Sequence, residues 1–295
     1  MEQFKFINNY MKNDKYRKSF NELTIKTFNI NFEEWYKEGY LGENYINYSF
    51  LCEDKVVANV SVNKFNIIHN GELKNAIQLG TVMTDENYRN RGLIRKLMDT
   101  ILKEYEDYDL IYLFANDSAL NFYPKFRFKK VIEGKYEMDI KETNKLDVKS
   151  NKVIKLDVKN EGHKRITKRL TKNRVPISQE LGIINDGSIL NLYSNYEFRD
   201  DLYYINEEDI IVILRRENNV VNIFDILSNN EFNLDNVISK IISKEDNTIQ
   251  FNFIPKSEKY KIDFKLKDNK EDALFVKDGK ENLEDGILFT KTSHT

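Results

Sequence analysis

A short basic turn is the part of this sequence whose residue types and spacing could do chemistry. Arg89, Arg91, Arg95 and Lys96 surround Gly92, where a strand pattern gives way to a helix pattern. The unpaired amides and the dipole at a helix N-terminus attract anions, and a glycine lets a phosphate approach the backbone closely. The turn therefore predicts a site for a ligand with several phosphates; the alternative is that the arginines only solvate the start of the helix.

The elements that must position this turn are a strand and an amphipathic helix. The strand is expected over 76–84, after the Asn70-Gly71 turn signal. The helix has one apolar face, made of Leu93, Ile94, Leu97, Met98, Ile101, Leu102 and Tyr105. A nearly unbroken apolar run over 109–116 is typical of a strand covered on both faces. Strand, helix and strand in this order predict a β-α-β unit with a right-handed crossover.

The remaining elements of the first half follow from spacing and turn residues. Helical spacing predicts two short helices, over 15–27 and 32–36, at the start of the chain. Two β-rich runs, 45–52 and 56–68, are separated by a short charged turn and predict a hairpin. A short helix over 118–126 and a return strand over 128–131 complete the first half.

The second half repeats this order of elements. Strands are expected over 202–205, 210–215, 220–227 and 248–254, and Asn233 is expected to cap a helix before the last of them. Between strand and helix this copy reads Ser-Asn-Asn-Glu-Phe-Asn, without arginine or glycine. The repeat suggests duplication of one fold. We predict an α/β protein with two tandem domains, 1–141 and a degenerate copy over 161–295, joined by a polar connection over 142–160.

Composition bounds the class of protein. The chain has 295 residues, 40% hydrophobic and 32% charged, which predicts a globular protein long enough for two domains. A net charge of −2 offers no basic excess for nucleic acid. The sequence shows no leader pattern and no long apolar run, so no membrane association is expected. With a single cysteine, Cys52, the protein is predicted to be cytoplasmic; its three scattered histidines predict no metal site.

Residues 78–98 resemble the coenzyme-A-binding motif of the GNAT superfamily of N-acetyltransferases. The family pattern is Gln or Arg, two residues, Gly, one residue, then Gly or Ala, and it corresponds here to Arg89, Gly92 and Ile94. Ile94 departs from the small residue of the pattern. A bulky residue at this position resembles the branch of the mycobacterial enhanced-intracellular-survival (Eis-like) acetyltransferases.

A second signature lies further along the chain. Residues 116–128 resemble the Asn-to-Tyr-to-Gly-Phe stretch that closes the coenzyme site of the family, with Arg127 in place of the usual glycine. The resemblance implies two tandem GNAT-like domains, each a mixed, twisted sheet with flanking helices and a splayed pair of parallel strands. Acetyl-CoA would lie between the strands 76–84 and 109–116. The residues implied to bind it are Val82, Met83, Thr84, Arg89, Asn90, Arg91, Gly92, Leu93, Ile94, Arg95 and Asn116.

For the reaction, the resemblance implies direct attack of a primary amine on the thioester in a ternary complex. Tyr123 matches the family tyrosine that gives a proton or a hydrogen bond to the departing thiolate; the alternative is that its ring only packs against its aromatic neighbours. Trp35 and Tyr36 fall in the region that forms the acceptor wall in similar enzymes, and ordinary packing explains them equally well. No general base is assigned from the sequence.

Several alternatives stay open at this level. The chain could instead be a non-catalytic acetyl-CoA sensor or interaction protein, or an acyltransferase that uses a longer acyl-CoA. The acceptor could be a small molecule or a peptide amine, because fold resemblance does not choose among amines. A homo-oligomer is compatible with the sequence.

Overall fold

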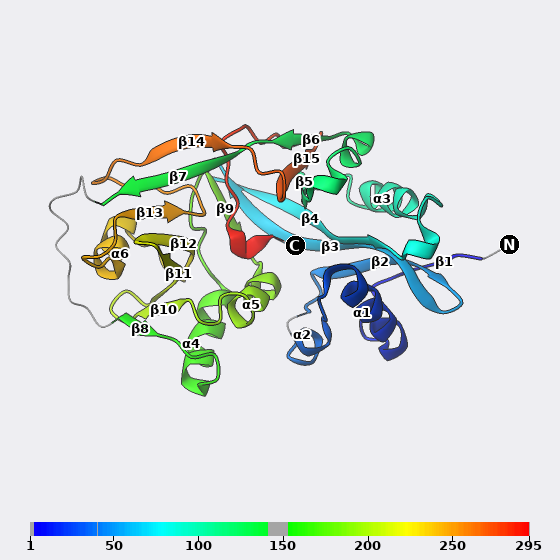
Figure 1. Cartoon of the computed structure of the whole chain (residues 1–295), viewed down its shortest axis with the longest axis horizontal. Helices are drawn as coiled ribbons and strands as arrows, with labels where there is room; N and C mark the ends of the chain where they lie inside the picture. The colour runs from blue at the N-terminus through cyan, green and yellow to red at the C-terminus, as the bar shows by residue number, and fades with distance from the viewer. Residues whose placement is uncertain (1–2, 40, 141–152, 295) are drawn as a thin grey trace.

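Two mixed β-sheets with flanking helices make up the protein (Figure 1). This computed structural model describes residues 3–39, 41–140 and 153–294. The N-terminal strands and α1 lie at one end of the molecule, the second sheet lies at the other, and the described C-terminal end lies between them. The predicted α/β class with two repeated units is confirmed.

The first half follows the predicted order of elements. Its helices and strands are β1 (Lys5–Asn8), α1 (Asp14–Phe28), α2 (Glu33–Lys37), β2 (Tyr45–Cys52), β3 (Lys55–His69), β4 (Glu72–Thr84), α3 (Leu93–Glu104), β5 (Leu110–Ala115), β6 (Phe128–Val131) and β7 (Glu133–Asp139). The short helix predicted over 118–126 is instead two 3₁₀ turns, η2 (Asp117–Ala119) and η3 (Tyr123–Phe126). A further 3₁₀ turn, η1 (Glu86–Tyr88), precedes the basic turn.

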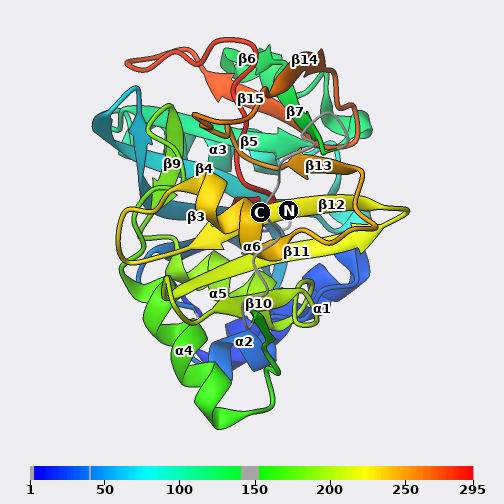
Figure 2. The same ribbon diagram turned by 90° about the vertical axis from the view of Figure 1, so that its left-hand side faces the viewer.

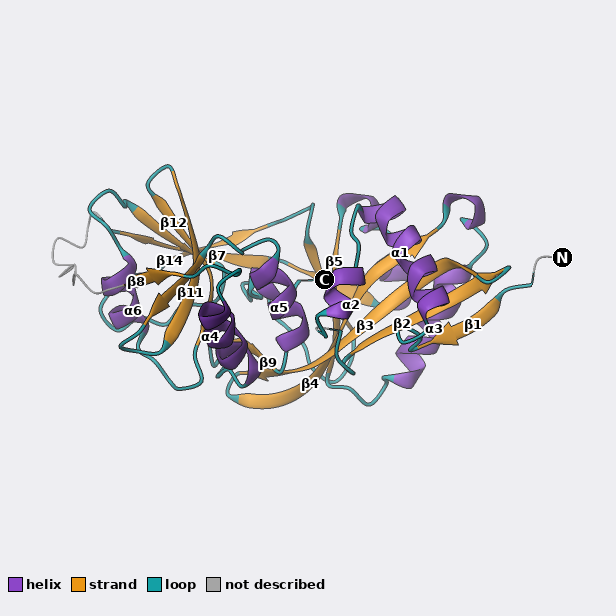
Figure 3. Cartoon of the chain, turned by 90° about the horizontal axis from the view of Figure 1, so that it is seen from below, coloured by secondary structure: helices purple, strands orange, loops and turns teal. Residues whose placement is uncertain are grey.

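The first sheet is ordered β1-β2-β3-β4-β5-β15-β6. Its central pair, β4 and β5, is parallel and joined by α3, as the β-α-β pattern predicts. The buried side of α3 is made of Leu93, Leu97, Met98 and Ile101, which confirms the predicted apolar face. Figure 3 shows α1 and α3 on opposite faces of this sheet.

The second half contains more elements than the sequence predicts. They are β8 (Val153–Lys155), α4 (Glu161–Lys172), β9 (Leu181–Ile184), α5 (Gly187–Asn195), β10 (Leu202–Ile205), β11 (Ile210–Glu217), β12 (Val220–Leu227), α6 (Leu234–Ile241), β13 (Thr248–Phe251), β14 (Asp263–Lys267), β15 (Ala273–Lys277) and η4 (Lys291–Ser293). The side chain of Asn233 accepts a hydrogen bond from the Asn236 amide, so the predicted cap of α6 is confirmed. The strand predicted over 248–254 ends earlier, at Phe251.

The two sheets exchange strands. The second sheet is ordered β14-β7-β13-β12-β11-β10-β8, so β7 from the first half lies inside it (Figure 2). In return, β15 from the second half pairs with both β5 and β6 of the first sheet. The predicted division at residue 141 therefore differs from the division between the sheets. Of the predicted connection over 142–160, residues 142–152 lie outside the described residues, and β8 within it belongs to the second sheet.

A buried acid lies where the exchanged strand begins. Glu133, at the start of β7, is 8% exposed and accepts a hydrogen bond from the Phe289 amide at 3.4 Å. Burial raises the pKa of Glu133 to about 8. A carboxylate with a raised pKa binds its proton more tightly in the folded than in the unfolded state.

Folding stability should therefore fall as the pH rises from about 4.5 to about 8, because the unfolded chain releases this proton first. Glu133→Gln keeps the side-chain shape and removes the titration. We expect the melting temperature of the wild type to drop more steeply across this pH range than that of the variant, measured by thermal unfolding. Equal slopes for the two proteins would contradict the assignment.

Candidate active site

A cavity of about 780 Å³ opens where β4 and β5 separate. The parallel pairing runs from Ala76 opposite Leu110 to Leu79 opposite Leu113, whereas β4 continues to Thr84. The structure brings all the predicted cofactor-binding residues together around this cavity, and Tyr123 with them. They are Val82, Met83, Thr84, Arg89, Asn90, Arg91, Gly92, Leu93, Ile94, Arg95 and Asn116.

A β-bulge shapes the wall that β4 contributes. Asn59 of β3 pairs with Met83 and Ser61 pairs with Gly80, so β4 carries one extra residue between these pairs. Thr81 has a φ of 46°, and its carbonyl accepts a hydrogen bond from Asn59 Nδ2 at 2.9 Å. Because pairing with β5 has already ended, the backbone groups that follow the bulge have no ladder partner on the cavity side. A ligand that lies between the strands can bind these groups.

The first turn of α3 forms the opposite wall. Gly92 is its N-cap, with a φ of 73°, and its carbonyl accepts the first helical hydrogen bond from the Lys96 amide at 3.2 Å. The amides of Leu93, Ile94 and Arg95 precede this bond, so they have no acceptor within the helix. A Cβ atom built on Gly92 would meet no atom within 4 Å. An anion can therefore approach this backbone closely.

Two of the arginines are held beside this turn by aromatic rings. The guanidinium of Arg91 lies 5.1 Å from the centre of the Tyr88 ring and donates from Nη2 to the Asn87 carbonyl at 3.1 Å. The guanidinium of Arg95 lies 5.3 Å from the centre of the Phe126 ring. Both side chains are exposed, so their charges face the solvent near the cavity mouth. This arrangement favours a polyanionic ligand.

Tyr123 lies at the start of η3 and is buried. Its ring packs against Phe122, with 5.3 Å between the ring centres, and against Phe275 of β15 at 5.9 Å. Burial raises the pKa of Tyr123 to about 12, so the phenol is protonated at neutral pH. Packing of the Tyr123 ring against its aromatic neighbours is therefore compatible with a position on the cavity wall. The role of Tyr123 as an acid stays a prediction.

Trp35 and Tyr36, the predicted acceptor residues, lie outside this cavity. Trp35 is 2% exposed and packs against Phe32 and Tyr45, with ring centres 5.2 and 5.7 Å away. The guanidinium of Arg17 lies over the ring of Tyr36, 3.9 Å from its centre. Packing accounts for both positions, and a contact with the acceptor stays a prediction.

A histidine that was not predicted as a site residue lies against the cavity wall. The ring of His294 stacks on Phe114, which lines the cavity, with 3.6 Å between the ring centres. Its Nδ1 lies 2.8 Å from a carboxylate oxygen of Asp272, and its buried Nε2 has no hydrogen-bond partner among the described residues. Burial lowers the pKa of His294, although Asp272 acts in the opposite direction. The lowered pKa favours the neutral imidazole.

No sequence pattern could have marked this pair. Asp272 precedes β15, His294 follows η4, and Phe114 belongs to the first half of the chain. The strand exchange explains how the pair forms. Because β15 pairs with β5, it brings the chain around Asp272 to the edge of β5.

The equivalent place in the second half has different chemistry. Here β12 and β13 are parallel and α6 connects them. At the start of α6 the carboxylate of Asp235, which is 2% exposed, accepts hydrogen bonds from the Ser257 hydroxyl and from the amides of Glu258 and Lys259. The Val175 amide donates to the Ser228 carbonyl at 2.8 Å, at the end of β12. In the second half, Asp235 and the chain segment at Val175 therefore lie where the first half has the open amides of α3. This difference is consistent with a degenerate copy.

Comparisons with known proteins agree with this geometry. The family profile described as "Acetyltransferase (GNAT) domain" matches residues 10–131. A probable N-acyltransferase from Enterococcus faecalis is 15% identical, with a TM-score of 0.61 over 95% of this chain and 73% of that one. A GCN5-related N-acetyltransferase from Kribbella flavida is 11% identical, with a TM-score of 0.57 over 93% and 71%. Eis1 from Mycobacterium abscessus is 10% identical, with a TM-score of 0.56 over 93% and 73%. No curated protein sequence matches the chain.

The fold and the family profile define an acyltransferase domain in the first half of the chain. Residues 10–131 match the profile of the GNAT acetyltransferase domain, and the whole chain shares its two-sheet fold with the probable N-acyltransferase from Enterococcus faecalis and with Eis1. The resemblance drawn from the sequence is thus confirmed. Among the described residues, no group of three or more His, Cys, Asp or Glu could hold a metal ion, and no helix is long and apolar enough to cross a membrane.

Gly92→Glu tests whether the turn binds a polyanion. A carboxylate above the open amides should repel phosphates, so we expect affinity for acetyl-CoA to fall about 100-fold in calorimetry. Gly71→Glu is the matched control, because Gly71 also has a positive φ, of 80°, and open space around its Cβ position.

Both variants should lose about 1–2 kcal/mol of stability from the left-handed backbone. Only the Gly92 variant should lose affinity. Equal affinities for acetyl-CoA in the two variants would show that the ligand lies elsewhere.

Proposed function

We propose that this protein transfers an acetyl group from acetyl-CoA to a primary amine of a small molecule or peptide. The observation that supports this proposal is one cavity that joins an open helix N-terminus to two separating parallel strands. The GNAT domain supports acyl transfer in general. We place the reaction in the cytoplasm, in keeping with the single, buried and unpaired Cys52.

In this proposal the diphosphate of the coenzyme lies on the amides of Leu93, Ile94 and Arg95. Arg89, Arg91 and Arg95 supply the charge around it, and Asn90 and Gly92 shape the turn. The pantetheine arm runs between the separated strands, along the backbone of Val82, Met83 and Thr84 on one side and past Asn116 on the other. The reaction uses no metal ion.

The chemistry needs three groups around the thioester. The amine nitrogen attacks the acetyl carbon while a backbone amide near Met83 stabilises the oxyanion. The carbon–sulfur bond then breaks, and the departing thiolate takes a proton from Tyr123. We infer that His294 accepts the proton that the amine must lose, because its Nε2 is unpartnered and its ring stacks on the cavity wall.

The second domain has a supporting role in this proposal. We propose that the second domain spans residues 161–295 and that the GNAT domain spans residues 1–141. Its β15 brings Phe275 against Tyr123, and its last described residues bring His294 against Phe114. It would thus shape the acceptor side of the site and stabilise the first domain.

Tyr123→Phe tests the acid. Loss of the phenol proton should lower kcat at least about 10-fold in a free-thiol assay with an amine panel, because a positioned acid contributes about 100-fold or more. Acetyl-CoA affinity should stay unchanged, since the ring is kept. Tyr203→Phe, on β10 of the second sheet, is the control. Tight acetyl-CoA binding without thiol release for any amine would favour the non-catalytic sensor instead.

His294→Gln tests the base through pH dependence. With a weakly basic acceptor, wild-type kcat/KM should fall as the pH drops through the pKa of His294, which burial places below its ordinary value of 6.5. The variant should be about 100-fold slower and should lack this acidic limb. His163→Gln, on α4 of the second half, should behave as wild type. An unchanged acidic limb in His294→Gln would exclude this histidine as the base.

A further inference from the structure

A second cavity, of about 510 Å³, lies beside the cavity of the candidate active site. Its volume is within the range of pockets that hold small molecules. Arg95, in the first turn of α3, lines both cavities, so the two openings meet at this residue. From there the second cavity continues between α3, which contributes Leu102 and Lys103, and β15, which contributes Lys277. A ligand bound at the first turn of α3 therefore has this second cavity within reach.

Cations gather at the Arg95 end of the second cavity. The guanidinium of Arg95 lies over the ring of Phe126, and Lys125 and Arg127 flank this phenylalanine in the chain. Lys277 is the last residue of β15, which pairs with β6 directly after Arg127. All four cations line the cavity, and we call Arg95, Lys125, Arg127 and Lys277 the basic cluster.

No member of the basic cluster forms a salt bridge within the part of the chain that the structure describes. By contrast, the ammonium group of the neighbouring Lys129 lies 3.2 Å from a carboxylate oxygen of Asp278. Burial lowers the pKa of Lys277, and the charge of Arg127 lowers it further, whereas Asp278 acts in the opposite direction. Cations that are held close together repel each other, so an anion bound between them is stabilised.

Four acids also line the second cavity. Asp278 already forms the salt bridge described above, and Asp109 accepts a hydrogen bond from the Asn75 amide at 2.8 Å. Asp99 and Glu106 are exposed, and they follow the first turn of α3 by one turn or more. The excess of positive charge therefore lies at the end that adjoins the active-site cavity.

The backbone of Arg127 has a left-handed conformation, with a φ of 62°. Glycine adopts this conformation readily, whereas a residue with a side chain is disfavoured in it. The Arg127 amide donates to the Pro124 carbonyl, and its carbonyl accepts from the Asp278 amide, both at 3.0 Å, so the conformation is fixed on both sides. An arginine costs stability at such a position, which indicates a function for its charge.

We propose that the basic cluster binds the 3′-phosphate of acetyl-CoA, and that Arg127 and Lys277 select this coenzyme against thioesters that lack the group. This inference rests on the proposed function, in which the diphosphate lies on the first turn of α3. One ribose separates the diphosphate from the 3′-phosphate, and Arg95 lies between the two phosphate sites in this arrangement. Through Lys277, the second half of the chain then contributes a residue to the coenzyme site.

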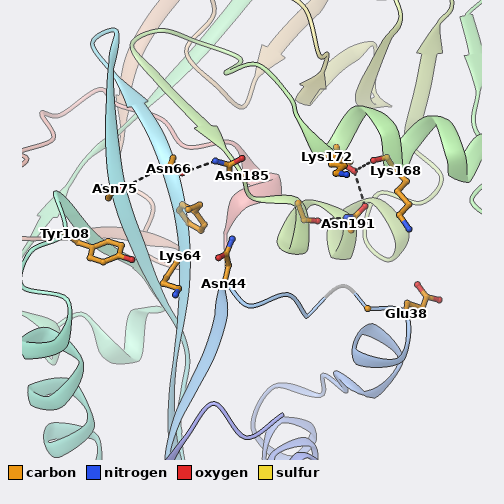
Figure 4. Close-up of a pocket in the computed structure, with 14 residues that line it drawn as sticks. Glu38, Asn44, Lys64, Asn66, Asn75, Tyr108, Lys168, Lys172, Asn185 and Asn191 are labelled. Atoms are coloured by element: carbon orange, nitrogen blue, oxygen red, sulfur yellow. Dashed lines mark hydrogen bonds between the residues drawn. The ribbon is translucent and has the colours of Figure 1, made fainter. Parts of the chain in front are cut away.

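A third opening also contains lysines but is separate from the coenzyme site. It has a volume of about 590 Å³, and Figure 4 shows Lys64, Lys168 and Lys172 around it. Among the described residues, none lines both this opening and the active-site cavity. Its lysines therefore provide a control for unspecific attraction between the protein and a polyanion.

Two ligands test the proposal: acetyl-CoA and acetyl-dephospho-CoA, which lacks only the 3′-phosphate. Calorimetry on the full chain at one fixed ionic strength gives both dissociation constants. We expect the wild type to bind acetyl-CoA at least about 10-fold more tightly, because a hydrogen bond to a charged group contributes a factor of this order.

Lys277→Gln should weaken binding of acetyl-CoA about 10-fold and leave binding of acetyl-dephospho-CoA unchanged. Lys168→Gln, in the separate opening, is the control and should match wild type with both ligands. If Lys277→Gln weakened both ligands equally, the lysine would act on a part of the coenzyme that the two share, which contradicts the proposal.

Arg127→Gly separates a role in binding from a role in folding. Glycine relieves the left-handed backbone, so the melting temperature should rise. The preference for acetyl-CoA over acetyl-dephospho-CoA should nevertheless fall about 10-fold, because the guanidinium is lost. A variant that keeps the full preference would show that Arg127 has no part in binding the 3′-phosphate.

The failures of the two proposals are distinguishable. Equal affinities of the wild type for the two ligands would overturn the 3′-phosphate site and leave acetyl transfer standing. Absence of binding for both ligands would overturn both proposals.

Discussion

The site depends on the early end of pairing between β4 and β5. Four residue pairs hold these parallel strands together, and beyond Leu79 and Leu113 the two strands no longer pair with each other. The bulge at Thr81 keeps β4 attached to β3 while it frees the cavity side of its backbone. Because the strands are parallel, the helix between them must begin at this same end, so the amides above Gly92 meet the opened backbone. One interruption in a ladder thus produces both walls of the cavity.

Local patterns in the sequence predicted the parts of this site that are local. The apolar face of α3, the strands beside it and the Gly92 turn depend on spacing within a few residues, and the structure confirms these elements. A row of buried polar side chains, Asn63, Gln78 and Tyr112, was not predicted because the three residues belong to different strands, and only their register brings them together. The register of a sheet depends on the whole packed structure, so a single sequence does not reveal such a row.

The strand exchange was missed for a related reason. The seven residues of β7 include four charged ones, a composition typical of a surface connection, yet β7 pairs on both sides within the second sheet. The apolar β15 was not assigned either, and its partners lie more than a hundred residues earlier. For Trp35 the difficulty lies in the residue type, because a tryptophan fits both an acceptor wall and a core. The structure shows Trp35 buried against Phe32 and Tyr45.

The second half lacks the basic turn, and one of its buried clusters supports the end of the described chain. The buried guanidinium of Arg174 bonds to the carboxylates of Asp186 and Asp225, and Thr292 donates to Asp225 as well. This cluster fixes the chain just before His294, which stacks on Phe114. Removing Arg174 would leave two buried carboxylates without their charged partner, a strongly unfavourable state. The second half thereby holds the end of the described chain against the cavity of the first half.

The exchange of β7 and β15 also has a consequence for synthesis on the ribosome. The edges of β5 and β6 that β15 joins emerge long before β15 itself, and at ordinary elongation rates the delay is on the order of ten seconds. During this time the nascent first sheet exposes unpaired backbone edges, which are templates for wrong pairing. Assembly of the first sheet is therefore completed only after β15 has been synthesised, and chaperones that shield strand edges should matter more for this protein than for a single-domain relative.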